Sequence, residues 1–158
     1  MQEENIRTPN EVRSSQMKEK LISTARELFA KNGFAATSTP EIVKLAGVTR
    51  GALYHHFNDK KALFKAVVTN EAECVALEIK RTVQSDSGAK QALIDGALAY
   101  FEAISVEGRA KLLLIEGPSV LGHDEIAKID IITGGNELKQ GLEYAVSQGD
   151  LRLSLIHI

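Results

Sequence analysis

Hydrogen-bonding and basic side chains are concentrated between residues 38 and 60. They are Ser38, Thr39, Thr49, Arg50, Tyr54, His55 and Lys60, and the small residue Gly51 lies among them. Hydroxyl and cationic groups bind phosphate oxygens, and the planar guanidinium of Arg50 also matches the O6/N7 edge of guanine. Gly51 adds almost no bulk, so a helix end that carries it can approach a duplex closely. These residue types predict a surface that binds nucleic acid.

Two short helices joined by a glycine turn would position these side chains. The sequence predicts a first helix over residues 40–46 and a second over residues 50–56. Gly47 suits the positive φ of a helix end, and the Thr49 hydroxyl can cap the second helix. The apolar face of the first helix is expected to comprise Ile42, Val43, Leu45 and Ala46. This arrangement is typical of a helix-turn-helix, whose second helix enters the DNA major groove.

The second helix has one inward and one outward side. Leu53 and Phe57 are four residues apart and are expected to face the core, whereas Tyr54 and His55 project outward. Lys60 follows directly at the start of the next helix, where a cation and free backbone N–H groups could bind phosphate together.

The start of the first helix has two possible caps. Pro40 suits the first helical position, which would make Thr39 the N-cap. Ser38 and Glu41 instead have the spacing of a capping box. These observations leave both alternatives open.

The segment GVTRGALYHHFNDKKALF resembles the DNA-binding signature of the TetR/AcrR family of one-component transcriptional repressors. The residues in register with the family pattern are Gly47, Val48, Thr49, Gly51, Leu53, Tyr54, Phe57, Lys60 and Leu63. The family pattern favours Ser38 as the cap, and Pro40 departs from the residue that the family usually carries. The resemblance places the Ser38 or Thr39 hydroxyl near a backbone phosphate, and we assign the Tyr54 hydroxyl to the same backbone.

The same resemblance implies an all-α fold, with an N-terminal three-helix DNA-binding head and a helical regulatory domain. It also implies a homodimer that represses transcription by binding a palindromic double-stranded operator. A small-molecule effector of unknown identity would enter the regulatory domain, move the helix after the recognition helix, and release the DNA.

The rest of the chain is also expected to be helical. Periodic apolar positions predict helices over residues 15–31, 59–84, 89–105, 109–116 and from 119 to 144 and beyond. Residues 1–14 are polar and lack this periodicity, which predicts a flexible arm. Gly117-Pro118 should stop a helix, because proline disfavours helical backbone in the residue before it. Gly134 and Gly135 should kink the last helix.

These elements predict four parts of the chain. They are the arm at 1–14, a helix-turn-helix domain at 15–58, an incomplete ligand-binding and dimerisation domain at 59–152, and a non-native tail at 153–158. Residues 85–88 would link two helices within the regulatory domain. Candidate effector-binding residues there are Phe101, Leu112 and His123. Cys74 lies close to an apolar stripe, which favours a core position over a reactive thiol.

Composition supports a cytoplasmic protein without a membrane anchor. The chain has 158 residues and no apolar run near the roughly 18 residues of a membrane span. Its single cysteine cannot form an internal disulfide. Residues 1–70 carry a net charge of +4 and residues 71–158 a net charge of −6. A basic N-terminal part fits a DNA-facing head.

Other classes of function have less support in the sequence. No nucleophile elbow, phosphate loop or cysteine-pair metal motif is present, so we expect neither an enzyme nor a cofactor. His55 and His56 diverge by about 100° on a helix and cannot share a metal ion. The run from His123 to Glu125 is better explained as a solvated helix start than as an ion site. The competing alternative is a small-molecule or metal sensor without operator binding of its own.

The end of the chain carries one further expectation. Residues 153–158 read LSLIHI, which is also one translation of CTGTCTCTTATACACATC, the transposon-end adaptor of sequencing libraries. We therefore expect these residues to be non-native, and the two helices that build the family's dimer interface to be missing. Without those helices, the apolar faces that they cover would be exposed.

Overall fold

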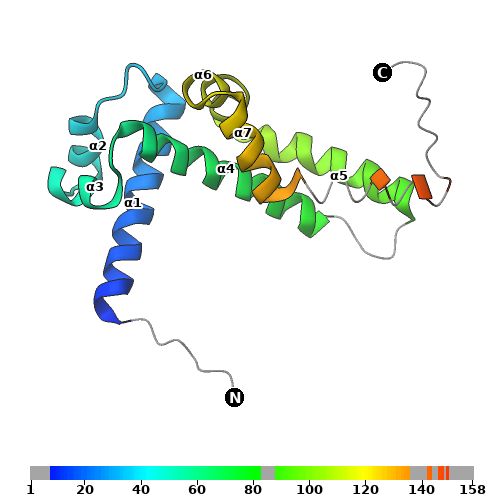
Figure 1. Ribbon diagram of the computed structural model, residues 1–158, viewed down its shortest axis with the longest axis horizontal. Helices are drawn as coiled ribbons and strands as arrows, with labels where there is room; N and C mark the ends of the chain where they lie inside the picture. The colour runs from blue at the N-terminus through cyan, green and yellow to red at the C-terminus, as the bar shows by residue number, and fades with distance from the viewer. Residues whose placement is uncertain (1–7, 83–87, 136–141, 144–145, 148, 150–158) are drawn as a thin grey trace. The chain divides into compact units, whose positions relative to one another are not determined.

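A computed structural model describes residues 8–82, 88–135, 142–143, 146–147 and 149 (Figure 1). These residues form helices and no strand, which confirms the predicted all-α class. The chain divides into two compact units, residues 1–67 and residues 68–158. The division falls after Val67, inside a helix. The tail at 153–158 and the region of the 85–87 linker lie outside the described residues.

The first helix, α1 (Pro9–Asn32), begins earlier than residue 15, where we expected it. Thr8 and Glu11 form a capping box that starts it. The Glu11 backbone N–H donates to Thr8 Oγ1 at 3.3 Å, and the Thr8 N–H donates to Glu11 Oε2 at 2.7 Å. The expectation of a flexible arm is therefore wrong for residues 9–14, while residues 1–7 lie outside the described part of the chain.

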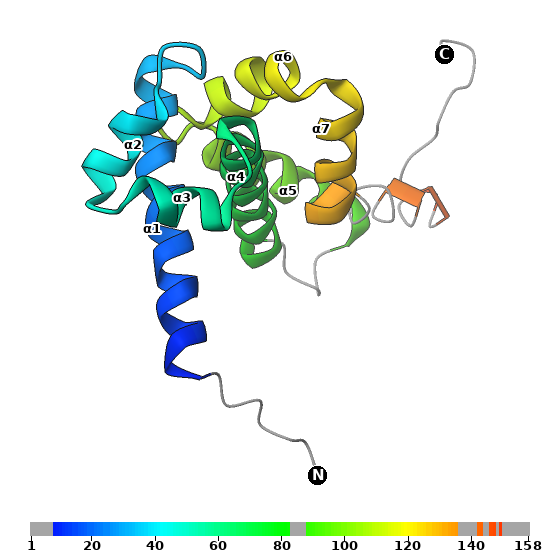
Figure 2. The ribbon, with the colours of Figure 1, turned by 60° about the vertical axis from the view of Figure 1, so that its left-hand side comes forward.

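The core of the first unit joins α1 to three further helices. These are α2 (Thr39–Ala46), α3 (Arg50–His56) and the start of α4 (Lys60–Thr82). Figure 2 shows α2 and α3 beside α1, as they also lie in Figure 1. The fully buried side chains include Leu21, Phe29, Ile42, Leu53, Leu63, Phe64 and Val67. Burial of each such side chain contributes about 1.5–3 kcal/mol relative to exposure.

Three phenylalanines tie this core together. The rings of Phe29 and Phe64 meet edge to face with centroids 5.1 Å apart, and Phe34 lies 5.8 and 5.0 Å from them. Leu45 was predicted to lie on the apolar face of α2, but it is 59% exposed and does not join the core. The face of α2 that is buried is thus narrower than expected, and Ile42 and Ala46 occupy it.

The second unit consists of the remainder of α4 and the elements that follow it. They are α5 (Ala89–Ile104), the π-helix η1 (Lys111–Glu116), α6 (Gly117–Leu121), α7 (His123–Asp130) and the π-helical segment η2 (Ile131–Gly135). The predicted helix over residues 89–105 is confirmed to within one residue. The kink expected near Gly134 is also present, because its φ of 171° is not helical.

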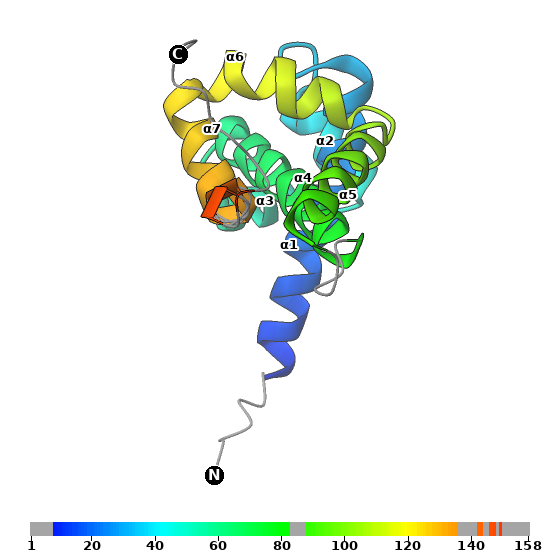
Figure 3. The ribbon, with the colours of Figure 1, turned by 90° about the vertical axis from the view of Figure 1, so that its right-hand side faces the viewer.

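The expectation that Gly117-Pro118 stops a helix is wrong. Figure 3 shows the ribbon running without a break from η1 into α6. Gly117 has helical φ and ψ of −54° and −60°, and its N–H donates to the Leu112 carbonyl in the wider π-type turn. A residue before proline avoids helical backbone partly because its Cβ meets the proline ring, and glycine has no Cβ. The break occurs instead at Gly122, where φ is 92°.

Gly117 also allows a close backbone approach, which gives a test of this account. A Cβ at residue 117 would lie 2.9 Å from the Leu112 carbonyl oxygen and 3.1 Å from Ile126 Cδ1. We expect Gly117→Ala to lower the free energy of unfolding by roughly 1–3 kcal/mol, the usual cost of overpacking. Urea unfolding followed by circular dichroism measures it. Gly51→Ala is the control, because its Cβ would lie no closer than 3.9 Å to a neighbour. Equal or higher stability of Gly117→Ala would contradict the prediction.

Candidate DNA-binding surface

The α2–turn–α3 segment is a helix-turn-helix, and two N-caps and one glycine turn define its helix ends. Ser38 caps α2 by accepting from the Glu41 N–H at 3.3 Å, which decides between the two alternatives in favour of Ser38. Gly47 takes the left-handed conformation, with φ 62° and ψ 37°, and ends α2. Thr49 caps α3 by accepting from the Ala52 N–H at 3.1 Å. The predicted turn and the predicted cap of the second helix are therefore confirmed.

The recognition helix α3 presents two different sides. Leu53 is completely buried and Phe57, which follows the helix, is 6% exposed, as predicted. Arg50, Gly51, Tyr54 and His55 are all exposed. Burial of Leu53 fixes the rotation of α3, and this rotation leaves the polar side chains facing solvent. The exposed side of α3 is thus accessible to a large partner such as a DNA duplex.

Arg50 and Tyr54 interact on this exposed side. The guanidinium carbon lies 5.4 Å from the centroid of the Tyr54 ring, within the range of a cation–π contact. Hydrogen bonding with the Thr39 side chain, and then with Arg50, lowers the pKa of the Tyr54 phenol. Thr39 begins α2, so these side chains link the outer sides of both helices. This contact biases the Arg50 side chain toward the exposed surface before any ligand binds.

The capping hydroxyls keep a donor for a ligand. Capping uses an acceptor lone pair of Ser38 and of Thr49, and each hydroxyl has one O–H besides. Both residues are exposed, and Thr39 is half-buried. A phosphate oxygen could therefore accept from these hydroxyls without loss of either cap.

Lys60 lies differently from the prediction. We expected its ammonium to face a phosphate, but it donates to the carbonyl oxygens of Phe34 at 2.8 Å and Thr37 at 2.9 Å. The ammonium also lies 4.2 Å from the centroid of the Phe34 ring. The side chain is half-buried and turned into its own unit. These contacts could not be predicted from local sequence, because the two partners precede Lys60 by 26 and 23 residues.

Comparison with known proteins agrees with this geometry. Residues 21–67 match the sequence profile of the family described as bacterial regulatory proteins, tetR family. Residues 21–67 are therefore similar to the DNA-binding domain of the tetR family. The matched residues contain the whole helix-turn-helix and the start of α4.

Two curated TetR-family relatives and one solved structure illustrate the extent of the similarity. QacR of Staphylococcus aureus is 47% identical over 55 residues, which are 35% of this chain and 29% of QacR. AcrR of Shigella flexneri is 31% identical over 102 residues, 64% of this chain and 47% of AcrR. The chain thus spans less than half the length of either relative. A tetR-family regulatory protein from Rhodococcus RHA1 has the same fold, with a TM-score of 0.71, 24% identity, and coverage of 87% of this chain and 73% of that one.

The histidines do not form a metal site among the described residues. The rings of His55 and His56 lie 5.2 Å apart, but no group of three or more His, Cys, Asp or Glu is placed to hold an ion in the described ranges. Burial lowers the pKa of His56, and the neighbouring charges of His55 and Lys18 lower it further. His55 is exposed, whereas His56 is half-buried.

The candidate effector residues of the second unit lie in different environments. Leu112 is completely buried, whereas Phe101 is 64% exposed and His123 is exposed. The structure therefore does not gather these three side chains into one buried site. Cys74 is half-buried, and burial together with the charge of Glu71 raises the pKa of its thiol. A raised pKa keeps the thiol protonated and makes it a poor nucleophile at neutral pH.

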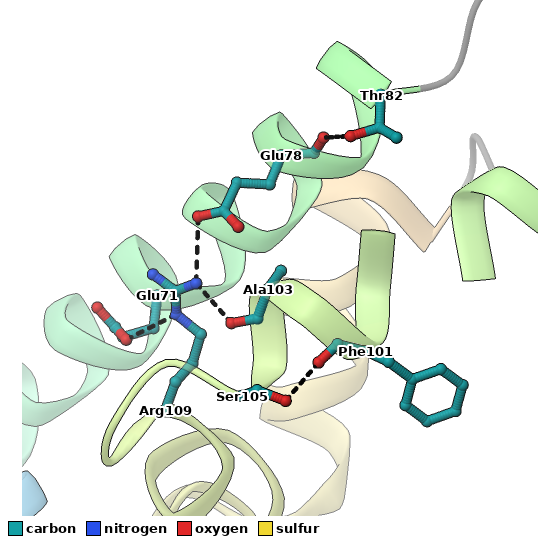
Figure 4. A network of polar contacts seen from close by, with 7 residues as sticks. All are labelled: Glu71, Glu78, Thr82, Phe101, Ala103, Ser105 and Arg109. Atoms are coloured by element: carbon teal, nitrogen blue, oxygen red, sulfur yellow. Dashed lines mark hydrogen bonds and ion pairs between the residues drawn. The ribbon is translucent and has the colours of Figure 1, made fainter. Parts of the chain in front are cut away.

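A buried charged network in the second unit was missed by sequence reasoning. Arg109 is 6% exposed, and its Nε donates to Glu71 Oε2 at 3.0 Å. Its Nη1 donates to Glu78 Oε1 at 3.3 Å and to the Ala103 carbonyl at 2.7 Å (Figure 4). Burial acts to lower the pKa of Arg109, but Glu71 and then Glu78 outweigh burial and raise it. The sequence contained one signal for this network. Glu71 and Glu78 are seven residues apart, which places both carboxylates on one face of α4.

No helix among the described residues is long and apolar enough to span a membrane.

Proposed function

We propose that the protein is a cytoplasmic DNA-binding transcriptional regulator, which represses by binding a palindromic operator as a homodimer and is released by a small-molecule effector. The observation that carries the proposal is the rotation of α3, which buries Leu53 and leaves Arg50, Gly51, Tyr54 and His55 exposed. The match of residues 21–67 to the tetR family supports the same function. The alternative, a sensor without operator binding, gives no role to this exposed face.

The proposed roles follow from the chemistry of each group. Arg50 reads a guanine edge or binds a phosphate, and Gly51 allows the end of α3 to enter the groove. His55 lies on the same exposed side of α3 and donates or accepts a hydrogen bond there. The hydroxyls at the starts of the two helices bind backbone phosphates, which fixes the register of α3 on the duplex. They belong to Ser38, Thr39 and Thr49.

The effector would act on the second unit. Phe101 and His123 are exposed and accessible to a ligand, whereas the buried Leu112 becomes accessible only when its packing opens. In this proposal the effector shifts α4, which contributes residues to both units.

Selection from a pool of random DNA duplexes tests operator binding directly. The expected result is enrichment of one shared half-site, with binding that weakens steeply as salt concentration rises. A pool that stays random after repeated rounds, together with salt-independent retention on heparin, would support the sensor alternative instead.

Tyr54 provides a finer test of the proposed surface. Tyr54 is 40% exposed, so Tyr54→Phe should change the melting temperature only slightly, although the hydroxyl also bonds to the Thr39 side chain. The substitution keeps the cation–π contact with Arg50 but removes the hydroxyl, so binding to the selected duplex should weaken a few-fold. Fluorescence anisotropy and a thermal melt measure the two effects. A large fall in melting temperature would show that the hydroxyl has a structural role and would contradict the assignment.

A further inference from the structure

The first half of α1 extends beyond the core of the first unit. Leu21 is completely buried, whereas each described side chain of residues 10–20 is exposed or half-buried. Figures 1 and 2 both show this part of α1 running past α3. The exposed side chains of this stretch are therefore accessible to a partner that binds α3.

Two exposed lysines of this stretch lie beside the helix-turn-helix. A Cβ at Gly47 would lie 3.9 Å from Lys20 Nζ, which places this ammonium at the turn before α3. Burial and the charge of His55 lower the pKa of His56, and the charge of Lys18 lowers it further, so the second ammonium lies near the last residue of α3. α1 thus brings one cation to each end of the recognition helix.

Helical geometry explains this placement. With about 100° between successive residues, Lys18 lies about 60° and Lys20 about 100° from the buried Leu21, on opposite sides of it. Both side chains therefore border the line along which α1 meets the other two helices. Glu19 lies about 160° from Leu21 and accepts a hydrogen bond from Ser15 Oγ at 3.1 Å. Its carboxylate is directed away from the side on which the lysines flank α3.

The separation of these cations suits the major groove. α3 has seven residues and is therefore about 10 Å long. The major groove is about 12 Å wide, so a recognition helix within it has a phosphate backbone near each of its ends. Lysine carries three donors on a flexible four-carbon stem, so it can bind a phosphate without a fixed geometry.

We propose that Lys18 and Lys20 are a second set of DNA contacts, which bind the two phosphate backbones beside the groove that α3 enters. This inference rests on the proposed operator binding and adds α1 to the surface formed by α2 and α3. Phosphate contacts carry no base information. The two lysines therefore raise affinity and its salt dependence without changing the preferred sequence.

Neutral variants test these contacts through affinity and salt dependence. Lys18→Gln and Lys20→Gln should each lower the slope of log K against log salt concentration by about 0.9. The double variant should bind about tenfold more weakly at low salt and lower the slope by about 1.8. The loss should be equal on the selected duplex and on a scrambled duplex. A loss confined to the selected duplex, or an unchanged slope, would overturn the proposal.

Lys31 provides the matched control on the same helix. It is exposed in the last turn of α1, roughly 16 Å along the helix axis from Lys20. Lys31→Gln removes the same charge, so it reports the loss of general electrostatic attraction alone. Its effect on affinity should be smaller than that of Lys20→Gln. Equal effects would show that net charge rather than contact is responsible, and would refute the proposal.

Arginine variants separate a phosphate contact from a structural role. Arginine keeps the charge and binds phosphate at least as well as lysine, so Lys18→Arg and Lys20→Arg should bind like the wild type. Both lysines are exposed, so the glutamine variants should melt at the temperature of the wild type. Weak binding of the arginine variants, or a fall in melting temperature that accounts for the binding loss, would contradict a phosphate contact.

Labelling of the wild-type protein needs no variant. Acetylation by acetic anhydride, read by mass spectrometry, should be suppressed at Lys18 and Lys20 when the selected duplex is bound, and unchanged at Lys31. Equal labelling of the three lysines with and without bound duplex would refute the α1 contacts and leave operator binding intact. If no duplex is enriched, the proposed operator binding fails, while labelling with an unselected duplex at low salt still tests the two lysines.

Discussion

Replacing Arg50 with alanine is expected to weaken binding to the selected operator by about 1–3 kcal/mol if this residue reads a base. Arg50 is exposed at the start of α3, and its guanidinium lies 5.4 Å from the Tyr54 ring. A side chain already held in this way loses less conformational entropy when it binds a guanine edge. The loss should be largest on the preferred sequence and should relax specificity at one base pair of each half-site.

The pattern of loss across sequences decides which group Arg50 contacts. A phosphate contact would weaken binding on all duplexes alike and would lower the salt slope by about 0.9. Arg81→Ala is the matched control, because Arg81 is exposed at the far end of α4 and should change neither affinity nor specificity. Unchanged binding of Arg50→Ala would exclude both roles for Arg50.

The helix-turn-helix could be predicted from the sequence because its signals are local. Gly47 ends α2, Thr49 caps α3, and the inward spacing of Leu53 and Phe57 lies within a few residues of both. Steric freedom, capping and helical periodicity act over one or two turns, and a single sequence contains them in full. The capping box at the start of α1 was equally local, and the polar composition of the first residues obscured it.

Features that depend on tertiary contacts could not be predicted in the same way. Lys60 finds its acceptors 23 and 26 residues away, so its place at the start of a helix does not indicate that its ammonium bonds to these carbonyls. The helix through Pro118 depends on the π-type turn that ends at Gly117. Arg109 meets Glu71 38 residues away, and the seven-residue spacing of Glu71 and Glu78 does not identify Arg109 as their partner.

Arg109→Met is expected to lower the free energy of unfolding by roughly 3–5 kcal/mol, the usual cost of breaking a buried ion pair. Methionine has a similar length but no charge, so the carboxylate of Glu71, which is 4% exposed, would lose its guanidinium partner while it stays buried. The Ala103 carbonyl would also lose its donor at 2.7 Å. The Glu78 side chain is 43% exposed and can be solvated, so its share of the loss should be small. Because small domains have only about 5–15 kcal/mol of stability, the effect should be large.

Two further variants separate the buried charge from the lost packing. Urea unfolding of Arg109→Met should be compared with Arg81→Met, an exposed change that should stay within about 0.5 kcal/mol of the wild type. The double variant Glu71→Met/Arg109→Met should recover much of the stability, because replacing both partners of a buried pair by apolar groups is often neutral or stabilising. If the double variant is less stable than Arg109→Met, Glu71 stabilises the fold independently of Arg109, and its unpaired buried charge is not the cause of the loss. A change of less than 1 kcal/mol in Arg109→Met would show that water already reaches Glu71, and the buried network would then contribute little to the fold.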